Sequence, residues 1–335
     1  MTERERFVKT LRREKVPGLV PTFELEFYLT MEALGRVHPS HRRYGQWKQM
    51  SPRERELHLR DMAEIYVGFA RKYGHSAIHV NAAPGGTDTK IRVLEYIREI
   101  SGDEFALLVY CDPTFSIPGG GDMMRFAERL YEDGDSLHGE AQLRVVSALC
   151  DAERIAKTGL IDGVCMCSDY CFNTNPFFSR DMFAEYIAPY LKQAIDACHE
   201  MGLLCIKHTD GNIMPILDMM VECGPDAIHS LDPQGGVDLA AVSRDWGDKV
   251  ALCGNVNCAL LQTGTQEEAD ADVRRALRDG MARGAGYVFC TSNCAYTGLP
   301  LERYERMIRI WREEGNYPAI AALTPSANCS SALAK

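Results

Sequence analysis

A histidine and an aspartate two residues apart, in the stretch KHTDGN, are the residues of this chain best placed to bind a metal ion. The stretch ends an apolar run, and alternate residues of a strand project to one face, so His208 and Asp210 would lie side by side. Two thiols, Cys253 and Cys294, lie within or at the end of later apolar runs. Nitrogen, oxygen and sulfur donors that converge in this way can hold zinc tetrahedrally. The alternative is a hydrogen-bonded His–Asp pair without a metal ion.

The stretch GVCMCSDYC, residues 163–171, contains three cysteines and an aspartate. Cys165, Cys167 and Asp169 alternate along the run and therefore share one face. Two thiols spaced in this way lie roughly 6–7 Å apart, which is poor spacing for one metal ion. We interpret Cys165 and Cys167 as small apolar residues that fill the interior below Asp169. Cys171 lies beyond the run and is expected in a loop.

Eight short apolar runs, separated by amphipathic helical stretches, are the elements that must position these residues. Strands that alternate with helices predict a parallel sheet, and eight such units predict one (β/α)8 TIM barrel. The connection over residues 27–75 is long and is expected to hold extra helices. The predicted strands cover residues 18–26, 76–82, 105–112, 163–169, 203–210, 227–232, 250–257 and 287–293.

The clearest helical pattern covers residues 179–201, where apolar residues recur every three or four positions. Ser179 can cap its start and Gly202 can end it. A last helix is expected to open at Pro300, since proline is favoured in a first turn. We expect residues 1–320 to form a single barrel domain, and the small polar residues of 321–335 to form a flexible tail.

Polar residues gather at the C-terminal ends of the predicted strands. In a TIM barrel this rim carries the active site, so the pattern predicts catalysis there. His229 has the opposite parity to Asp232 and is expected to be packed or hydrogen-bonded. The rim residues are Glu24, Glu26, Asn81, Asp112, Asp169, His208, Asp210, Asp232, Asn255, Asn257, Asn293 and Cys294.

The overall composition excludes several classes of protein. The net charge of −10 argues against nucleic acid or an anionic membrane as the main partner. No apolar run approaches the roughly 18 residues that a membrane span needs. The charged N-terminus lacks the apolar core of a signal peptide, and the 13 cysteines are expected to be reduced thiols of a cytoplasmic protein.

Several segments resemble the uroporphyrinogen decarboxylase superfamily, and together they cover roughly residues 150–315. They are FFSRDMFAEYIAPYLKQAIDACHEMG, KHTDGNIMPILDMMVECGPDAIHSLDPQGGVDLAAV, WGDKVALCGNVN and SNCAYTGLPLERYERMI. The resemblance implies a (β/α)8 barrel, in agreement with the pattern of runs. It also implies one of two chemistries, either cofactor-free decarboxylation of a tetrapyrrole or corrinoid-linked methyl transfer, often with zinc.

The residues favour the methyltransferase branch. A tetrapyrrole with many carboxylates needs arginines near the first strand, whereas this chain has Glu24 and Glu26 there, which would repel such a substrate. The resemblance to the zinc-dependent enzymes matches His208 to their histidine and places Cys294 near their last cysteine. Asp210 stands where they have a cysteine, and a hard oxygen ligand favours activation of an ether oxygen over a thiol.

The stretches FELEFYLTMEALG and NCAYTGLPLERY resemble the methoxyaromatic O-demethylase group. We therefore expect methyl transfer from a phenyl methyl ether to the cob(I)alamin of a partner corrinoid protein. The charge on the leaving oxygen must be neutralised by zinc or by an acid, for which Glu24, Glu26 and Tyr296 are the candidates. Further residues expected to orient the ring substituents are Asp169, Asn255 and Asn257.

Two other functions remain as alternatives. One is a cofactor-free decarboxylase of the uroporphyrinogen decarboxylase type, which would need a cationic clamp at the rim. The other is a non-catalytic module that binds a corrinoid or a tetrapyrrole. The density of acidic, histidine and cysteine side chains at the rim argues against simple binding.

Overall fold

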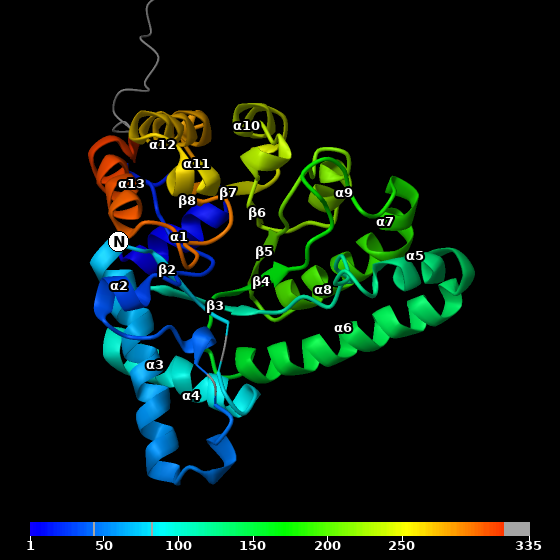
Figure 1. The fold of residues 1–335 in the computed structure, drawn as a ribbon, viewed down its shortest axis with the longest axis horizontal. Coiled ribbons are helices and arrows are strands. Elements are labelled where there is room, and N and C mark those ends of the chain that lie inside the picture. The colour runs from blue at the N-terminus through cyan, green and yellow to red at the C-terminus, as the bar shows by residue number, and fades with distance from the viewer. Residues whose placement is uncertain (43, 82, 318–335) are drawn as a thin grey trace, which may run out of the picture.

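The computed structural model describes residues 1–42, 44–81 and 83–317 (Figure 1). The tail expected over residues 321–335 lies outside the described residues. The centre of the molecule is a curled sheet of seven parallel strands that lie in chain order. These strands are β2 (Ala77–Val80), β3 (Ala106–Tyr110), β4 (Gly163–Cys167), β5 (Leu204–His208), β6 (Ala227–His229), β7 (Ala251–Val256) and β8 (Tyr287–Thr291).

Apart from the exposed Tyr110 and the partly buried Cys167 at two strand ends, the seven strands are buried on both faces, as expected of a parallel sheet covered by helices. On the concave face, Cys165 lies in register with Ile206, and Ile206 with Ala227. These side chains belong to an inner apolar cluster that also contains Cys253 and Cys290. The prediction that Cys165 fills the interior is therefore confirmed.

The first predicted strand, residues 18–26, is not a regular strand of this sheet. Only β1 (Gly18–Leu19) is regular, and it pairs antiparallel with β9 (Asn316–Tyr317). Beyond it, Thr22 forms an isolated parallel bridge to Phe289 of β8, and Phe27 forms one to Ala295 in the loop that follows. Pro21 has no N–H to donate and the chain bends at Leu25, so a continuous ladder cannot form. The described sheet has seven strands rather than the eight that the sequence predicted.

Helices cover the convex face of the sheet (Figure 1), and the first connection holds α2, α3 and two short 3₁₀ helices, as expected. The α-helices are α1 (Glu3–Leu11), α2 (Thr30–Leu34), α3 (Pro52–Tyr73), α4 (Thr87–Ser101), α5 (Met123–Glu132), α6 (Gly134–Ala156), α7 (Arg180–Tyr186), α8 (Ala188–Glu200), α9 (Leu217–Glu222), α10 (Leu239–Trp246), α11 (Cys258–Thr263), α12 (Gln266–Met281) and α13 (Leu301–Glu314). The 3₁₀ helices are η1 (Pro39–His41), η2 (Trp47–Gln49) and η3 (Pro233–Gly235). None of these helices combines the length and the apolar character that crossing a bilayer requires.

The helix predicted over residues 179–201 is two helices, α7 and α8, that meet at Ile187. Ser179 caps the start as expected, because its side chain accepts a hydrogen bond from the backbone N–H of Met182. The break arises because Pro189 cannot donate to the preceding turn. Pro300 is the residue before α13 rather than part of its first turn.

Candidate active site

Three predicted rim residues, Asp169, His208 and Asp210, converge where β4 and β5 end. One ligand atom from each lies within 4.8 Å of the other two. Nε2 of His208 is 3.9 Å from a carboxylate oxygen of Asp169 and 3.9 Å from one of Asp210. Those separations are too long for hydrogen bonds, yet an ion at the usual metal–ligand distance of about 2.0–2.2 Å can contact both atoms of such a pair. The donors therefore fit a divalent metal ion, and we call them the Asp–His–Asp triad.

The register of the sheet and the loops after the strands hold the triad in place. Cys167 lies opposite His208 in the β4–β5 ladder, so the residues that follow both strands come together. The backbone N–H of Asp210 donates to a carboxylate oxygen of Asp169 at 3.1 Å. The side chain of Asp210 accepts from the Ser230 hydroxyl at 2.8 Å and from the Asn293 amide. Burial raises the pKa of Asp210 to about 7, and the charges of Asp169 and Asp232 add to that effect.

His229 orients the histidine of the triad. The two Nδ1 atoms of His208 and His229 are 2.7 Å apart, so one ring donates and the other accepts. If His208 donates, its Nε2 lone pair faces the two carboxylates, as a metal ligand must. Burial lowers the pKa of His208 to about 4, which keeps the ring neutral. The sequence indicated that His229 is packed or hydrogen-bonded, but gave no sign that its partner is His208.

The two thiols predicted as ligands do not join the triad among the described residues. Cys253 belongs to the inner apolar cluster and is fully buried there. Cys294 is half-buried, and burial raises the pKa of its thiol above the ordinary range. Asp232 is not part of the triad either, because it accepts hydrogen bonds from the backbone of Gln234 and Gly211.

Four further residues that were predicted at the site have structural partners. Asn255 donates to the carbonyl of Leu231 at 2.7 Å and accepts from Arg275 at 3.0 Å. Asn257 caps the start of α11. Asp112 forms a buried ion pair with Lys207 at 2.7 Å.

The fourth, Tyr296, donates to the side chain of Gln262 at 2.9 Å. These contacts account for Asn255, Asn257, Asp112 and Tyr296 through turn, cap and packing interactions. None of the four therefore needs a bound substrate to satisfy its polar atoms.

Glu24 and Glu26 face different neighbours because the chain bends between them. Glu24 accepts from the hydroxyl and the backbone N–H of Thr291, and it also contacts Tyr304 of α13. Its carboxyl is buried, and burial raises its pKa to about 8. These contacts direct Glu24 toward β8 and α13.

Glu26 is buried beside two histidines. One of its oxygens lies 3.7 Å from Nδ1 of His79, and the other lies 3.9 Å from Nε2 of His38. Neither oxygen accepts a well-aligned hydrogen bond from a described residue. Burial raises the pKa of Glu26 to about 8, and the nearby Asn81 side chain opposes that effect. His79 was visible in the sequence only as a polar residue inside an apolar run, and nothing marked His38.

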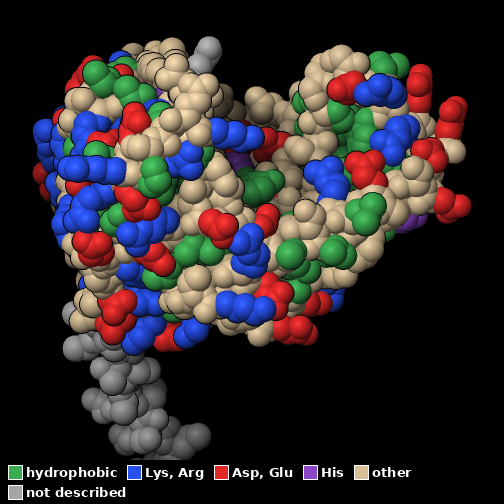
Figure 2. All heavy atoms as spheres, turned by 90° about the horizontal axis from the view of Figure 1, so that it is seen from below, with side chains coloured by type: hydrophobic (Ala, Val, Ile, Leu, Met, Phe, Trp, Pro, Cys, Tyr) green, Lys and Arg blue, Asp and Glu red, His purple; other side chains and the backbone are tan. Residues whose placement is uncertain are grey.

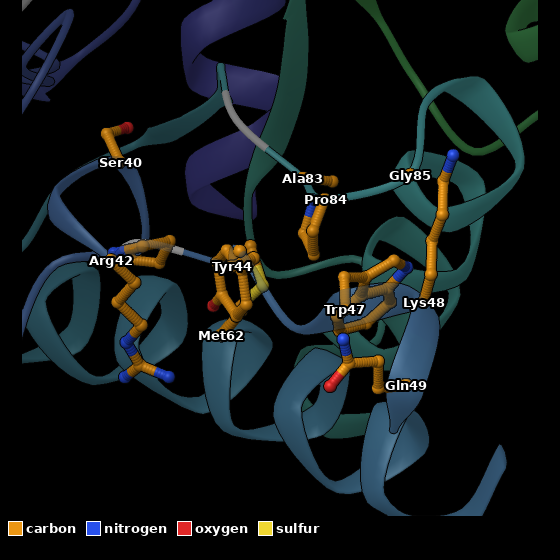
Figure 3. Close-up of a pocket in the computed structure, with 12 residues that line it drawn as sticks. Ser40, Arg42, Tyr44, Trp47, Lys48, Gln49, Met62, Ala83, Pro84 and Gly85 are labelled. Atoms are coloured by element: carbon orange, nitrogen blue, oxygen red, sulfur yellow. The ribbon is translucent and has the colours of Figure 1, made fainter. Parts of the chain in front are cut away.

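A cavity of about 710 Å³ adjoins this part of the molecule (Figure 3). Tyr44, Trp47 and Pro84 surround it, whereas the guanidinium of Arg42 points away from it. Pro39 and Ser40, which directly follow His38, also line it. On the larger scale, Figure 2 shows a hollow between the lobe that carries α5, α6 and α7 and the rest of the molecule.

A second cluster of metal-ligand types, His199, Cys205 and Asp226, lies at the opposite end of the sheet, where β5 begins. Here the side chains are already paired. His199 lies 2.9 Å from the carboxylate of Asp226, which also accepts from the backbone N–H of Cys205 at 2.8 Å. These contacts explain the cluster as a link between α8 and the strand ends.

Comparisons with known proteins agree with this fold. The family model described as uroporphyrinogen decarboxylase (URO-D) matches residues 143–314, slightly more than half of the 335 residues. The chain belongs to the uroporphyrinogen decarboxylase family. The resemblance of its sequence segments to this family is thereby confirmed, while a comparison with curated proteins finds no match.

Solved structures with a similar fold can also be compared with this URO-D family chain. A methyltransferase from Methanosarcina mazei superposes with a TM-score of 0.70 and 16% identity, over 94% of this chain and 99% of that chain. GH5_18 from Streptomyces cattleya, in complex with GlcNAc, gives a TM-score of 0.50 and 10% identity, over 90% of this chain and 83% of that chain. At these identities the likenesses show a shared fold.

Proposed function

We propose that this chain is a methyltransferase that moves a methyl group from a phenyl methyl ether to the cob(I)alamin of a partner corrinoid protein. The observation that carries the proposal is the convergence of Asp169, His208 and Asp210 at the C-terminal end of the sheet, where barrel enzymes hold their active sites. Membership of the URO-D family and the fold shared with a Methanosarcina mazei methyltransferase support it.

The triad would hold one divalent ion, for which we propose zinc. Two oxygen donors and one imidazole suit zinc bound to an ether oxygen better than zinc bound to a thiol. When bound, the ion supplies Lewis acidity that stabilises charge on the leaving oxygen. The residues of the chain orient the ion, through His229 behind His208 and through Ser230 and Asn293 behind Asp210.

We also propose that residues 1–320 form a single domain in which residues 20–27 close the barrel. Two backbone hydrogen bonds support closure. The N–H of Ser76 donates to the carbonyl of Thr22 at 2.6 Å, and the N–H of Phe289 donates to that of Pro21 at 2.9 Å. The segment thus lies between β2 and β8, the two edges of the seven-stranded sheet.

The family description makes decarboxylation the second candidate function. A substrate with many carboxylates would need cations at the rim. Among the described residues, however, the ion-pair partners of Asp169, Asp210 and Glu26 are histidines only. This acidic rim favours an uncharged ether over such a substrate.

Metal content tests the proposal. Protein purified without chelators should contain about one zinc per chain and should methylate added cob(I)alamin with methoxyaromatic donors. The variant His208→Ala should lose the zinc and most of the turnover while it keeps its fold. The matched control is His199→Ala, in the paired cluster at the other end of the sheet, which should retain both. Zinc that remains in His208→Ala, or release of carbon dioxide from a carboxylate substrate without cob(I)alamin, would contradict the proposal.

A further inference from the structure

The buried carboxyl of Glu26 is surrounded by histidine and cysteine side chains. Its side chain is 9% exposed, and the groups within ion-pair distance of it are His38 and His79. No described lysine or arginine forms an ion pair with it. Besides burial, the charge of Glu26 also raises the pKa of nearby tyrosine and cysteine side chains, which are Tyr28, Cys165, Cys167 and Cys294.

The partners of the two histidines fix which nitrogen carries the proton. Nδ1 of His79 is 2.9 Å from the carbonyl of Leu25, which can only accept, so that nitrogen carries a hydrogen. Nδ1 of His38 accepts from the backbone N–H of Ser40 at 3.2 Å, so the hydrogen of the neutral ring is on Nε2. The N–H of His79 is thus hydrogen-bonded to Leu25, whereas the Nε2–H of His38 is directed toward Glu26.

Glu26 differs from a buried carboxyl whose hydrogen bonds are already formed in the folded protein. Burial favours the neutral acid, yet the Nε2–H of His38, 3.9 Å from the carboxyl of Glu26, stands just beyond hydrogen-bond distance. A small movement would bring this N–H onto an ionised carboxylate, which accepts stronger hydrogen bonds than the neutral acid does. Glu24 is equally buried, but it is already hydrogen-bonded to Thr291. Unlike Glu24, Glu26 therefore combines a buried neutral carboxyl with a donor for its ionised form, the Nε2–H of His38, which is free among the described residues.

Glu26 and the triad contact the same loop, which follows β8. The pKa of the Cys167 thiol is raised by burial first, and also by the charges of Glu26 and Asp169. Burial also raises the pKa of the Cys294 thiol, and charges that include those of Glu26 and Asp210 add to that effect. The contacts of the loop after β8 agree, because the N–H of Ala295 donates to the backbone carbonyl of Glu26 at 3.0 Å and the side chain of Asn293 donates to Asp210.

We propose that Glu26 donates a proton to the leaving oxygen of the methyl donor, a role that rests on the proposed function. As the carbon–oxygen bond breaks, its electron pair stays on the oxygen, which takes the proton of Glu26. The methyl group bonds to the electron pair of the acceptor. Glu26 is left as a carboxylate that the N–H group of His38 stabilises, and it recovers a proton from water before the next turnover. His38 is a positioning residue.

A series of methyl donors with leaving groups of graded acidity tests the proposal, with free cob(I)alamin as acceptor. The variant Glu26→Gln should lose about 100-fold or more in rate with ethers of weakly acidic phenols, the range of general acid catalysis. With ethers of strongly acidic phenols its rate should stay close to that of the parent. The control Glu24→Gln should keep the parent's dependence on leaving-group acidity. An equal loss across the series, or none, for Glu26→Gln would overturn the proposal and leave the proposed function standing.

Infrared spectroscopy gives a readout that needs no turnover. The parent at neutral pH should show the carbonyl stretch of a buried neutral carboxyl that is lost in Glu26→Gln. His38→Phe removes one donor and should raise the pH at which this band disappears, whereas His38→Gln retains an N–H and should restore part of the shift. Identical neutral-carboxyl bands in the parent and in Glu26→Gln would overturn the donor role. Failure of the parent to use any methyl ether would count against the proposed function itself.

Discussion

Two buried glutamates make the stability of this protein depend on pH. Burial raises the pKa of Glu24 and of Glu26 from an ordinary value of 4.5 to about 8. Between these values the folded state binds more protons than the unfolded state, so the free energy of unfolding should fall as the pH rises. The full effect is about 5 kcal/mol for each carboxyl, since one pKa unit corresponds to about 1.4 kcal/mol.

Urea unfolding at a series of pH values measures this effect. The parent should be most stable near the ordinary glutamate pKa and should lose stability up to the folded-state pKa. Glu24→Gln and Glu26→Gln should each flatten the dependence, because an amide does not titrate. A parent whose stability rises through this window would show that the two carboxyls are ionised in the folded state.

At the scale of single residues, sequence reasoning found part of the candidate site. The sequence predicts the alternation of side chains along a strand and the positions of strand ends. It was therefore possible to place His208, Asp210 and Asp169 at one rim. Cys253 has the right parity, but its depth along the strand depends on the stagger of neighbouring strands, which a sequence does not reveal. The contacts of Glu26 with His38 could not be foreseen, since His38 lies in a long connection with no periodic pattern.

The loops after β4 and β5 are held together by close backbone contacts at a glycine. Gly211 has φ +82°, and a Cβ built on it would lie 2.7 Å from the carbonyl oxygens of Cys171 and Phe172. Because Gly211 directly follows Asp210, Gly211→Ala should push the two loops apart and displace the carboxylate of the triad. We expect a loss of about 1–3 kcal/mol in stability and a weaker affinity for zinc.

The variant Gly236→Ala distinguishes the cost of backbone strain from the effect of the close carbonyl contacts. Gly236 has a similar φ of +77°, but a Cβ there meets nothing within 4 Å. It should therefore show the cost of backbone strain alone, with zinc affinity unchanged. Zinc titration and urea unfolding of the two variants make the comparison. Equal zinc affinities would mean that the glycine contact does not position the triad.

At the scale of elements, the order of strands and helices followed from the pattern of apolar runs. Seven of the eight predicted strands form the sheet in chain order, because each run is buried on both faces. The prediction of a first strand was wrong because backbone pairing, rather than apolar character, defines a regular strand. Pro21 and the bend at Leu25 interrupt that pairing. The division of residues 179–201 at Ile187 reflects Pro189, whose effect outweighed an uninterrupted apolar period.

For the molecule as a whole, zinc binding and unfolding should be coupled in one transition. The two ends of the described chain are joined, because β1 pairs with β9 and the indole of Trp311 donates to the carbonyl of Val20 at 2.9 Å. If residues 1–320 are one domain, an ion that binds only the folded state stabilises all of it. Free zinc at 100 times its dissociation constant should add about 2.7 kcal/mol to the free energy of unfolding.

Urea unfolding with and without buffered zinc, followed by tryptophan fluorescence and by circular dichroism, tests this coupling. The tryptophans report from distant parts of the chain, at η2, α10 and α13. Both signals should shift together with zinc in the parent and in His199→Ala, and neither should shift in His208→Ala. Two separated transitions, of which zinc moves one, would show that the chain folds as more than one unit. A zinc response that survives in His208→Ala would place the ion outside the triad, because the imidazole nitrogen is the one donor that the two carboxylates cannot replace.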